Sequence, residues 1–225
     1  MQKGVDKMKI NMKLLTAALV LGGAVLLTSV ARADTVSIGL YESGYGLSTV
    51  ATGSGSALFA GSYGTFTFNT ITAVGTPPLP QPQLDSTSID VSSSTSGTIV
   101  IYVTEQGITW PTGVFGVLSG FTMNILTSGW TVTEATYVDA GNGLYALTSP
   151  LGSWTFTALG SASSANLTPS LSSPFSETEV FTIAANGTGR SNGTIATQLV
   201  PEPATLSLLG MGLLSLLGLR KKVRG

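Results

Sequence analysis

The stretch GTIVIYVTE, residues 97–105, decides the fold class of this chain. Nearly all of its residues are β-branched or aromatic, and such side chains fit the pleated surface of a sheet. A short apolar run of this kind, bounded by a glycine, predicts a central β-strand. We expect Val100 and Tyr102 to lie on the inward face of this strand.

Runs with a period of two extend the pattern on both sides. Residues 35–42, 64–72, 120–126, 129–138, 153–159 and 178–184 alternate apolar with small or polar side chains. No stretch between 34 and 200 shows a helical period, so we predict an all-β antiparallel sandwich, Greek-key or jelly-roll-like, of about eight or more strands. The side chains expected to point inward are Phe66, Phe68, Val100, Tyr102, Phe121, Met123, Ile125, Val132, Phe156, Phe181 and Ile183.

Several segments predict turns and loops between these strands. Asn142-Gly143, Asn186-Gly187 and Asn192-Gly193 are typical of hairpin turns, because both central residues of such turns need a positive φ. The proline-rich residues 75–88 predict an extended segment without ladder bonds. This segment is either a domain boundary or a surface crossover within one sandwich, and we favour the crossover, because 34–74 is too short for a core of its own. Residues 160–176 predict a second loop.

Composition excludes several classes of function. The chain has 225 residues, with no cysteine and no histidine. This composition excludes disulfides, and it excludes zinc sites of the Cys₄ and Cys₂His₂ types. It also excludes catalysis by Ser-His-Asp or Cys-His groups, and we expect no cofactor. Nine acids and one base, Arg190, give residues 34–200 a formal charge of −8. A nucleic-acid partner is not expected, because phosphate binding needs a basic surface.

The first 33 residues have the order of a secretory signal peptide. Lys9 and Lys13 precede an apolar run from 14 to 27, and the small residues Ala31 and Ala33 stand where signal peptidase reads its substrate. We expect a signal helix, with cleavage after Ala33. The alternative is a buried or anchoring helix, and either Met1 or Met8 is the start.

Residues 201–225 have three parts in a fixed order. Pro201, Glu202 and Pro203 come first, then sixteen uncharged residues from 204 to 219, and then the basic tail of Arg220, Lys221, Lys222 and Arg224. As a helix, the uncharged run would be about 24 Å long at ~1.5 Å per residue, which is short for a hydrocarbon core of ~30 Å but sufficient with local thinning. The basic tail favours a cytoplasmic C-terminus, so residues 34–200 are expected outside the inner membrane.

This terminus resembles the PEP-CTERM sorting signal of Gram-negative bacteria. The resemblance covers about the last twenty-five residues and implies recognition by an exosortase, removal of the tail, and delivery to the cell surface or the exopolysaccharide matrix of a biofilm. The domains expected are thus a signal peptide (1–33), an extracytoplasmic β-sandwich (34–200) and a sorting signal (201–225). A plain single-pass tail anchor is the alternative.

Glu177 and Glu179 are the first candidates for chemistry, because they share one face of a predicted strand. Paired carboxylates serve as acid and base in glycosidases or as calcium ligands. The interpretation that we favour is two solvated acids at the start of a strand, with no catalytic role and no metal.

Aromatic residues are the second candidates. These residues either form a platform on which sugars stack or fill the core as cross-strand pairs. They are Trp110, Trp130, Trp154, Tyr41, Tyr63, Tyr102, Tyr137 and Tyr145. Trp110 is the best single candidate, because it precedes Pro111 in an expected loop.

Two hypotheses for function follow. The first is a non-enzymatic surface or matrix protein that signal peptidase and an exosortase process and that has exopolysaccharide as a possible partner. The second is a secreted carbohydrate-binding or carbohydrate-active protein with Glu105, Glu177, Glu179 and Trp110 at its site. Carboxylates in an aromatic-lined cleft would favour the second hypothesis, and scattered exposed acids the first.

Overall fold

A computed structural model describes residues 34–79 and 83–200. These residues form twelve β-strands and no helix, so the all-β prediction is confirmed for the described part of the chain. The signal peptide expected over 1–33 and the sorting segment 201–225 lie outside the described residues. Within the described ranges, no helix has the length and hydropathy needed to cross a membrane.

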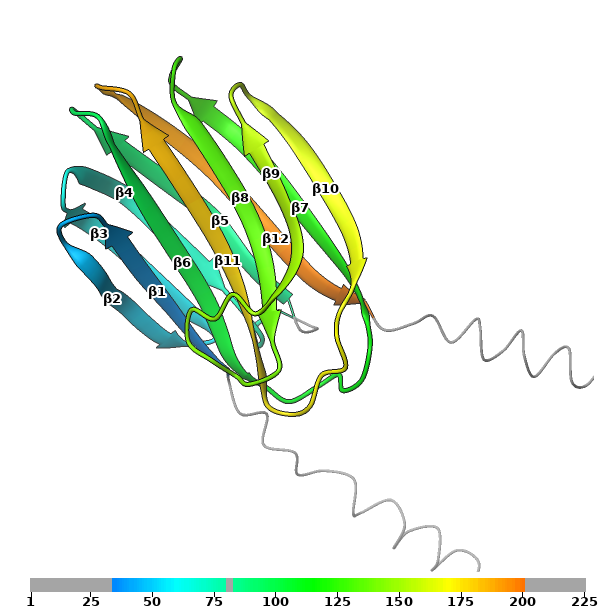
Figure 1. Cartoon of the computed structure of the whole chain (residues 1–225). Helices are drawn as coiled ribbons and strands as arrows, with labels where there is room; N and C mark the ends of the chain where they lie inside the picture. The colour runs from blue at the N-terminus through cyan, green and yellow to red at the C-terminus, as the bar shows by residue number, and fades with distance from the viewer. Residues whose placement is uncertain (1–33, 80–82, 201–225) are drawn as a thin grey trace, which may run out of the picture. The chain divides into compact units, whose positions relative to one another are not determined.

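The strands form two antiparallel six-stranded sheets that pack face to face (Figure 1). Sheet A has the order β2-β1-β6-β11-β8-β9, and sheet B has the order β10-β7-β12-β5-β4-β3. The bounds are β1 Thr35–Glu42, β2 Gly46–Ser54, β3 Ser56–Tyr63, β4 Phe66–Val74, β5 Gln83–Ser93, β6 Gly97–Ile108, β7 Gly116–Leu126, β8 Thr131–Asp139, β9 Ser149–Phe156, β10 Gly160–Leu167, β11 Phe175–Ala185 and β12 Gly189–Val200.

The central strand predicted from residues 97–105 is β6, which pairs with β1 on one side and β11 on the other. Its inward side chains are Ile99, Ile101 and Val103, all fully buried. The prediction for Val100 and Tyr102 was wrong, because they lie on the opposite face and are half-buried. Both faces of this strand carry apolar side chains, so alternation alone could not assign the inward one.

The other predicted inward positions are buried, with one exception. Ile125 is only half-buried, and Leu126 packs against the core in its place. The register between β7 and β12 shifts between Asn192 and Gly193, and such a bulge changes which residues face the core. The residues confirmed as buried are Phe66, Phe68, Phe121, Met123, Val132, Phe156, Phe181 and Ile183.

Two predicted loops contain strands. Residues 83–88 belong to β5, which pairs with β4 and β12, so the proline-rich segment connects two neighbours in one sheet and is no crossover between sheets. Residues 160–167 form β10 at the edge of sheet B. An exposed edge strand needs few large side chains, and the serine-rich composition therefore hid it from the sequence pattern.

The Asn-Gly pairs mark positive φ and bulges rather than simple hairpins. Gly187 has φ +95°, but its turn joins β11 of sheet A to β12 of sheet B. Asn192-Gly193 lies inside β12 at the bulge. Asn142, with φ +57°, belongs to the longer loop between β8 and β9.

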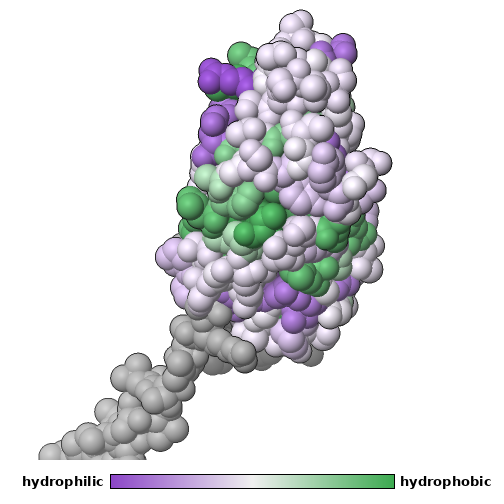
Figure 2. Space-filling model, turned by 90° about the vertical axis from the view of Figure 1, so that its left-hand side faces the viewer, coloured by the Kyte–Doolittle hydropathy of each residue, from purple (hydrophilic) through white to green (hydrophobic). Residues whose placement is uncertain are grey.

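The edge strands β2 and β3 lie on the same side of the sandwich, and Figure 2 shows exposed hydrophobic side chains there. Leu47 on β2 and Leu58 on β3 are exposed, and residues 43–84 contain no charge. Register shifts interrupt the pairing of both edge strands with their neighbours. Such bulges make an edge a poorer template for another strand, so they protect these uncharged edges.

The interior has two apolar clusters with a polar layer between them. The inward residues of β11 run in the order Phe175, Glu177, Glu179, Phe181 and Ile183. Phe181 and Ile183 belong to the larger cluster and Phe175 to the smaller one. The two glutamates of β11 therefore lie within the sandwich, between its two hydrophobic clusters.

Candidate functional site

The sorting motif Pro201, Glu202 and Pro203 lies outside the described residues, as do the basic tail, Ala31 and Ala33. The last strand, β12, ends at Val200, directly before Pro201. Candidate sites within the described residues are therefore the buried glutamates and the aromatic side chains.

Four glutamates are fully buried between the two sheets. Glu177 and Glu179 lie on β11, Glu105 on β6 and Glu134 on β8, each with no exposed surface. The favoured interpretation of Glu177 and Glu179 as solvated acids was wrong. Both residues follow the inward parity of the strand that places Phe181 and Ile183 in the core, so the period of two carries them inside.

Glu179 is satisfied by hydroxyl groups of the opposite sheet. The Ser86 hydroxyl donates to Oε2, and the Thr197 hydroxyl donates to Oε1 over 3.0 Å. Burial nevertheless raises the pKa of Glu179 well above its ordinary value, against the lowering effect of these hydrogen bonds.

Glu105 and Glu177 are directly opposite each other on neighbouring strands. Glu105 accepts a hydrogen bond from the Thr76 backbone N–H over 2.6 Å, whereas neither oxygen of Glu177 has a partner within the described part of the chain. Burial raises the pKa of Glu105 to about 8, and the Asp34 charge adds to the rise. Burial also raises the pKa of Glu177 well above its ordinary value, and Glu105 and Glu179 raise it further.

Glu134 packs against Gly193 of the opposite sheet. A Cβ at position 193 would collide with Oε1 of Glu134, so the glycine makes room for the carboxyl group. The Thr122 backbone N–H approaches this group without the geometry of a hydrogen bond. Burial raises the pKa of Glu134 to about 8, despite the lowering effect of that N–H.

This glutamate layer has the geometry of a sealed interior rather than of an open catalytic cleft. The carboxyl groups lie between the sheets, and no group of three or more acids within the described ranges is arranged to hold a metal ion. A glycosidase acid and base must both reach a bound sugar. The structure thus brings Glu105, Glu177 and Glu179 together, but away from the surface.

Tyrosines gather instead on the outer face of sheet A. Tyr41 on β1 and Tyr102 on β6 share this face, because Tyr102 is opposite Gly39 and Tyr41 is opposite Val100. The Tyr102 and Tyr145 ring centroids are 5.5 Å apart. Burial raises the pKa of Tyr102, and repulsion from the negative charges that Tyr41 and Tyr137 carry when ionised raises it further. We call these four residues, Tyr41, Tyr102, Tyr137 and Tyr145, the tyrosine face.

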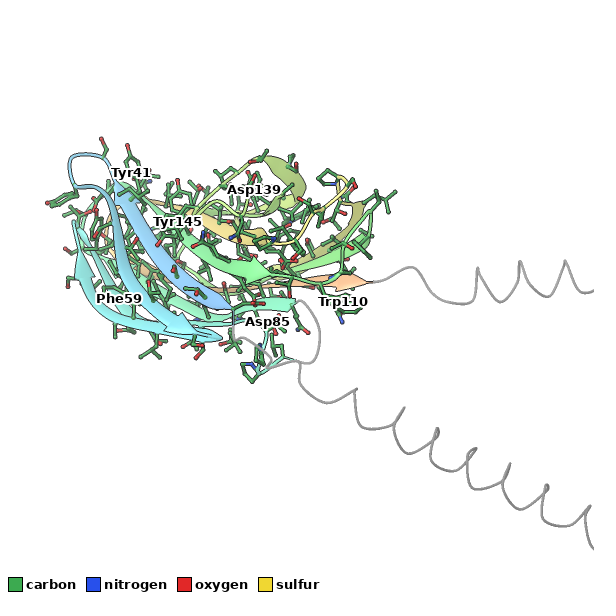
Figure 3. The ribbon with its side chains drawn as sticks, turned by 90° about the horizontal axis from the view of Figure 1, so that it is seen from below. Tyr41, Phe59, Asp85, Trp110, Asp139 and Tyr145 are labelled. Carbon is green, nitrogen blue, oxygen red and sulfur yellow. The ribbon has the colours of Figure 1, made fainter. Side chains whose placement is uncertain are left out.

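The remaining aromatic candidates lie elsewhere, and Trp154 is 51 % exposed on β9 at the edge of sheet A. Trp130 is buried in the larger cluster, as the core interpretation expected. Trp110 is 57 % exposed in the connection between β6 and β7, but it lies apart from Tyr41 and Tyr145 (Figure 3). The Tyr63 hydroxyl donates a hydrogen bond to the backbone carbonyl of Gly46, where the edge strands β2 and β3 lie. The best single candidate of the sequence therefore does not join the tyrosine face.

The terminal residues 199–222 match the family model of the PEP-CTERM protein-sorting motif. The resemblance noted in the sequence is thereby confirmed for the C-terminus. A signal of this kind indicates an exported protein that is anchored in the membrane by its C-terminus and processed by an exosortase. The match is confined to this terminal segment and includes only the last two residues of the sandwich, at the end of β12.

No curated protein matches the chain. Among solved structures, TmCBM61 in complex with β-1,4-galactotriose aligns with 12 % identity and a TM-score of 0.34, covering 64 % of this chain and 87 % of that one. The C-terminal CBM6 of LamC, a laminarinase of Zobellia galactanivorans, aligns with 12 % identity and a TM-score of 0.28, covering 48 % and 78 %. The mannan-recognising module TmCBM27 aligns with 7 % identity and a TM-score of 0.28, covering 71 % and 86 %. Likeness at these TM-scores supports no functional assignment.

Proposed function

We propose that this protein is a non-enzymatic surface or extracellular-matrix protein of a Gram-negative bacterium, exported through its signal peptide and released from the membrane by an exosortase. The observation that carries the proposal is the sorting motif at 199–222, which begins at the end of the last strand. The sandwich is then a cargo domain that reaches the cell surface or an exopolysaccharide matrix once the tail is removed.

The chemistry of the terminal segment supports separate roles for the sandwich as cargo and the terminus as sorting signal. Pro201 and Pro203 lack backbone N–H donors, so neither can donate to a strand ladder that would continue β12. Glu202 gives a processing enzyme one charged group beside an uncharged run. In this proposal the uncharged run 204–219 enters the membrane beside Glu202, and the basic tail is the part that favours the cytoplasmic side.

The buried acids support a non-enzymatic role. Glu105, Glu177 and Glu179 were the catalytic candidates, and all three are enclosed between the sheets. A group that cannot contact a substrate cannot exchange a proton with it. In this proposal the described domain acts through its binding surfaces.

Carbohydrate binding is the second candidate function, and the tyrosine face is the observation that favours it. Flat aromatic rings with hydroxyl groups at their edges provide both the apolar contact and the hydrogen bonds that sugar rings use. An exopolysaccharide is the natural partner in this proposal, because a sorted matrix protein would meet it after release.

Processing is tested with the Glu202→Ala variant in a host that carries an exosortase. We expect the variant to be exported but to remain uncut and membrane-bound, because the charged group beside the scissile region is lost. Ser207→Ala is the matched control, since it removes a hydroxyl from the neighbouring uncharged run, and it should be processed normally. If Glu202→Ala and wild type are trimmed and released equally, Glu202 is not being read, and if neither protein is trimmed, a plain tail anchor explains the terminus.

A further inference from the structure

Tyr145 is held in a backbone conformation that few residues adopt. Its φ is +56°, in the left-handed region that costs a non-glycine residue roughly 1 kcal/mol or more. Asn142 in the same loop has φ +57°. Two such residues within one short loop indicate that the surrounding contacts fix the loop in place.

Hydrogen bonds anchor this loop, residues 140–148, at both ends and in the middle. Asp139 accepts from the Gly143 N–H over 2.7 Å and from the Thr148 hydroxyl over 2.8 Å. The Ser176 hydroxyl on β11 donates to the Gly143 carbonyl over 2.9 Å. Asn142 accepts from the Gly107 N–H on β6 over 2.8 Å. The loop is therefore pinned across the outer face of sheet A.

The anchoring places the Tyr145 ring over β1 and β2. A Cβ at Gly39 would lie 2.6 Å from the ring, so only glycine at this position allows the ring to lie against the strand. The Tyr145 hydroxyl donates to Thr49 on β2 over 3.0 Å. Tyr145 is thus fixed beside Tyr102 before any ligand arrives, and a preorganised ring loses little freedom on binding.

The surroundings of the tyrosine face define the charge of its ligand. Asp139 stands at the end of the loop, on the same side of the molecule as Tyr41 and Tyr145 (Figure 3). Arg190 is the one basic residue of the described part of the chain, and it lies on β12 of the other sheet. An anionic ligand would meet a carboxylate and no cation here, which disfavours binding.

We propose that the tyrosine face binds a neutral polysaccharide, whose sugar rings stack on Tyr41, Tyr102 and Tyr145 and whose hydroxyls bond to the phenol groups. This inference rests on carbohydrate binding, the second candidate function above, and adds the place of the site and the class of ligand. The charge at Asp139 disfavours uronic-acid polymers as ligands of this site. The apolar side chains of Leu144 and Leu147, exposed on the same loop, extend the surface for ring contact.

The test measures binding of the whole chain, purified in detergent, to soluble neutral and anionic polysaccharides. The probes are a β-glucan, a galactan and polygalacturonate, followed by affinity electrophoresis or calorimetry. We expect binding to at least one neutral polymer and none to polygalacturonate. Tyr41→Ala should weaken that binding about tenfold, the loss that corresponds to ~1.4 kcal/mol of ring contact. Tyr41 is 42 % exposed, so its removal should leave the fold intact.

Trp110→Ala is the matched control, because it removes an exposed aromatic ring away from the tyrosine face and should bind as wild type. Gly39→Ala is a second probe that keeps all four tyrosines but displaces the Tyr145 ring, and it should also weaken binding. Loss of binding in Trp110→Ala with none in Tyr41→Ala would overturn this site while carbohydrate binding stands. Preference for polygalacturonate would overturn the neutral class, and no binding to any probe would overturn both the site and the second candidate function.

Discussion

Replacing Glu105 with glutamine should remove a measurable part of the pH dependence of the stability of the sandwich. In the folded protein burial raises the pKa of Glu105 to about 8, whereas the unfolded chain has an ordinary value near 4.5. A raised folded pKa means that the full stability is present below the unfolded pKa and is lost as the pH rises through the folded one. Wild-type stability should therefore fall between pH 4.5 and about 8.

The size of the effect follows from the shift. Each pKa unit corresponds to ~1.36 kcal/mol, so Glu105 alone should lower the free energy of unfolding by about 3 kcal/mol between pH 5 and pH 8. Burial of Glu134, whose pKa is also raised to about 8, adds a loss of similar size. Because domains are stable by only ~5–15 kcal/mol, the sandwich should be markedly more stable at pH 5 than at pH 8.

The assay is urea unfolding of wild type and Glu105→Gln at several pH values. Glutamine retains an oxygen that accepts from the Thr76 N–H but does not titrate, so the variant should keep about 3 kcal/mol more of its stability at pH 8. Leu58→Ala is the control, since it changes an exposed side chain and no ionisable group, and it should keep the wild-type slope. Equal slopes for wild type and Glu105→Gln between pH 5 and pH 8 would refute a neutral, buried Glu105.

Two further predictions concern packing between the sheets. Gly193→Ala should destabilise the domain by ~1–3 kcal/mol in urea unfolding, because the new Cβ collides with Glu134. The control Gly120→Ala should change the free energy of unfolding by less than ~0.5 kcal/mol, because its Cβ would meet only the Ala196 carbonyl at 3.9 Å. Equal effects of the two variants would contradict the close contact between Gly193 and Glu134. Phe181→Ala should lower the free energy of unfolding by ~3–5 kcal/mol, because buried apolar surface is lost and a cavity is left. Leu58→Ala at an exposed edge should lower it by less than ~0.5 kcal/mol. If thermal unfolding ranks the two variants in the opposite order, the assignment of the core is wrong.

The fold class was predictable because strand alternation is a local property. Phe66 and Phe68, or Phe181 and Ile183, have polar or small neighbours between them, so their parity identifies the inward face. In β6 both parities are apolar, and the inward face depends on which layer covers each side. The bulge at Gly193 depends on pairing between β7 and β12, which are far apart in the sequence, and no local pattern shows it.

The candidate sites were harder to predict for a related reason. A glutamate among serines and threonines is expected at the surface, yet Glu177 and Glu179 share the parity of Phe181, and that parity was the signal of their burial. The tyrosine face joins β1, β6, β8 and a loop after β8, so it exists only once the strand order is known. The sorting motif was predictable, because its three parts are contiguous in sequence.

The intact mass of the released protein is the most direct test of the central claim, that this is an exported protein cut at both ends. Expressed in a host with an exosortase, the chain should yield a soluble product that begins at Asp34 and lacks the uncharged run and basic tail after Pro203. In the same host without the exosortase, the product should keep the tail and stay in the membrane fraction. A product with an intact C-terminus in both hosts would contradict sorting through the PEP-CTERM signal.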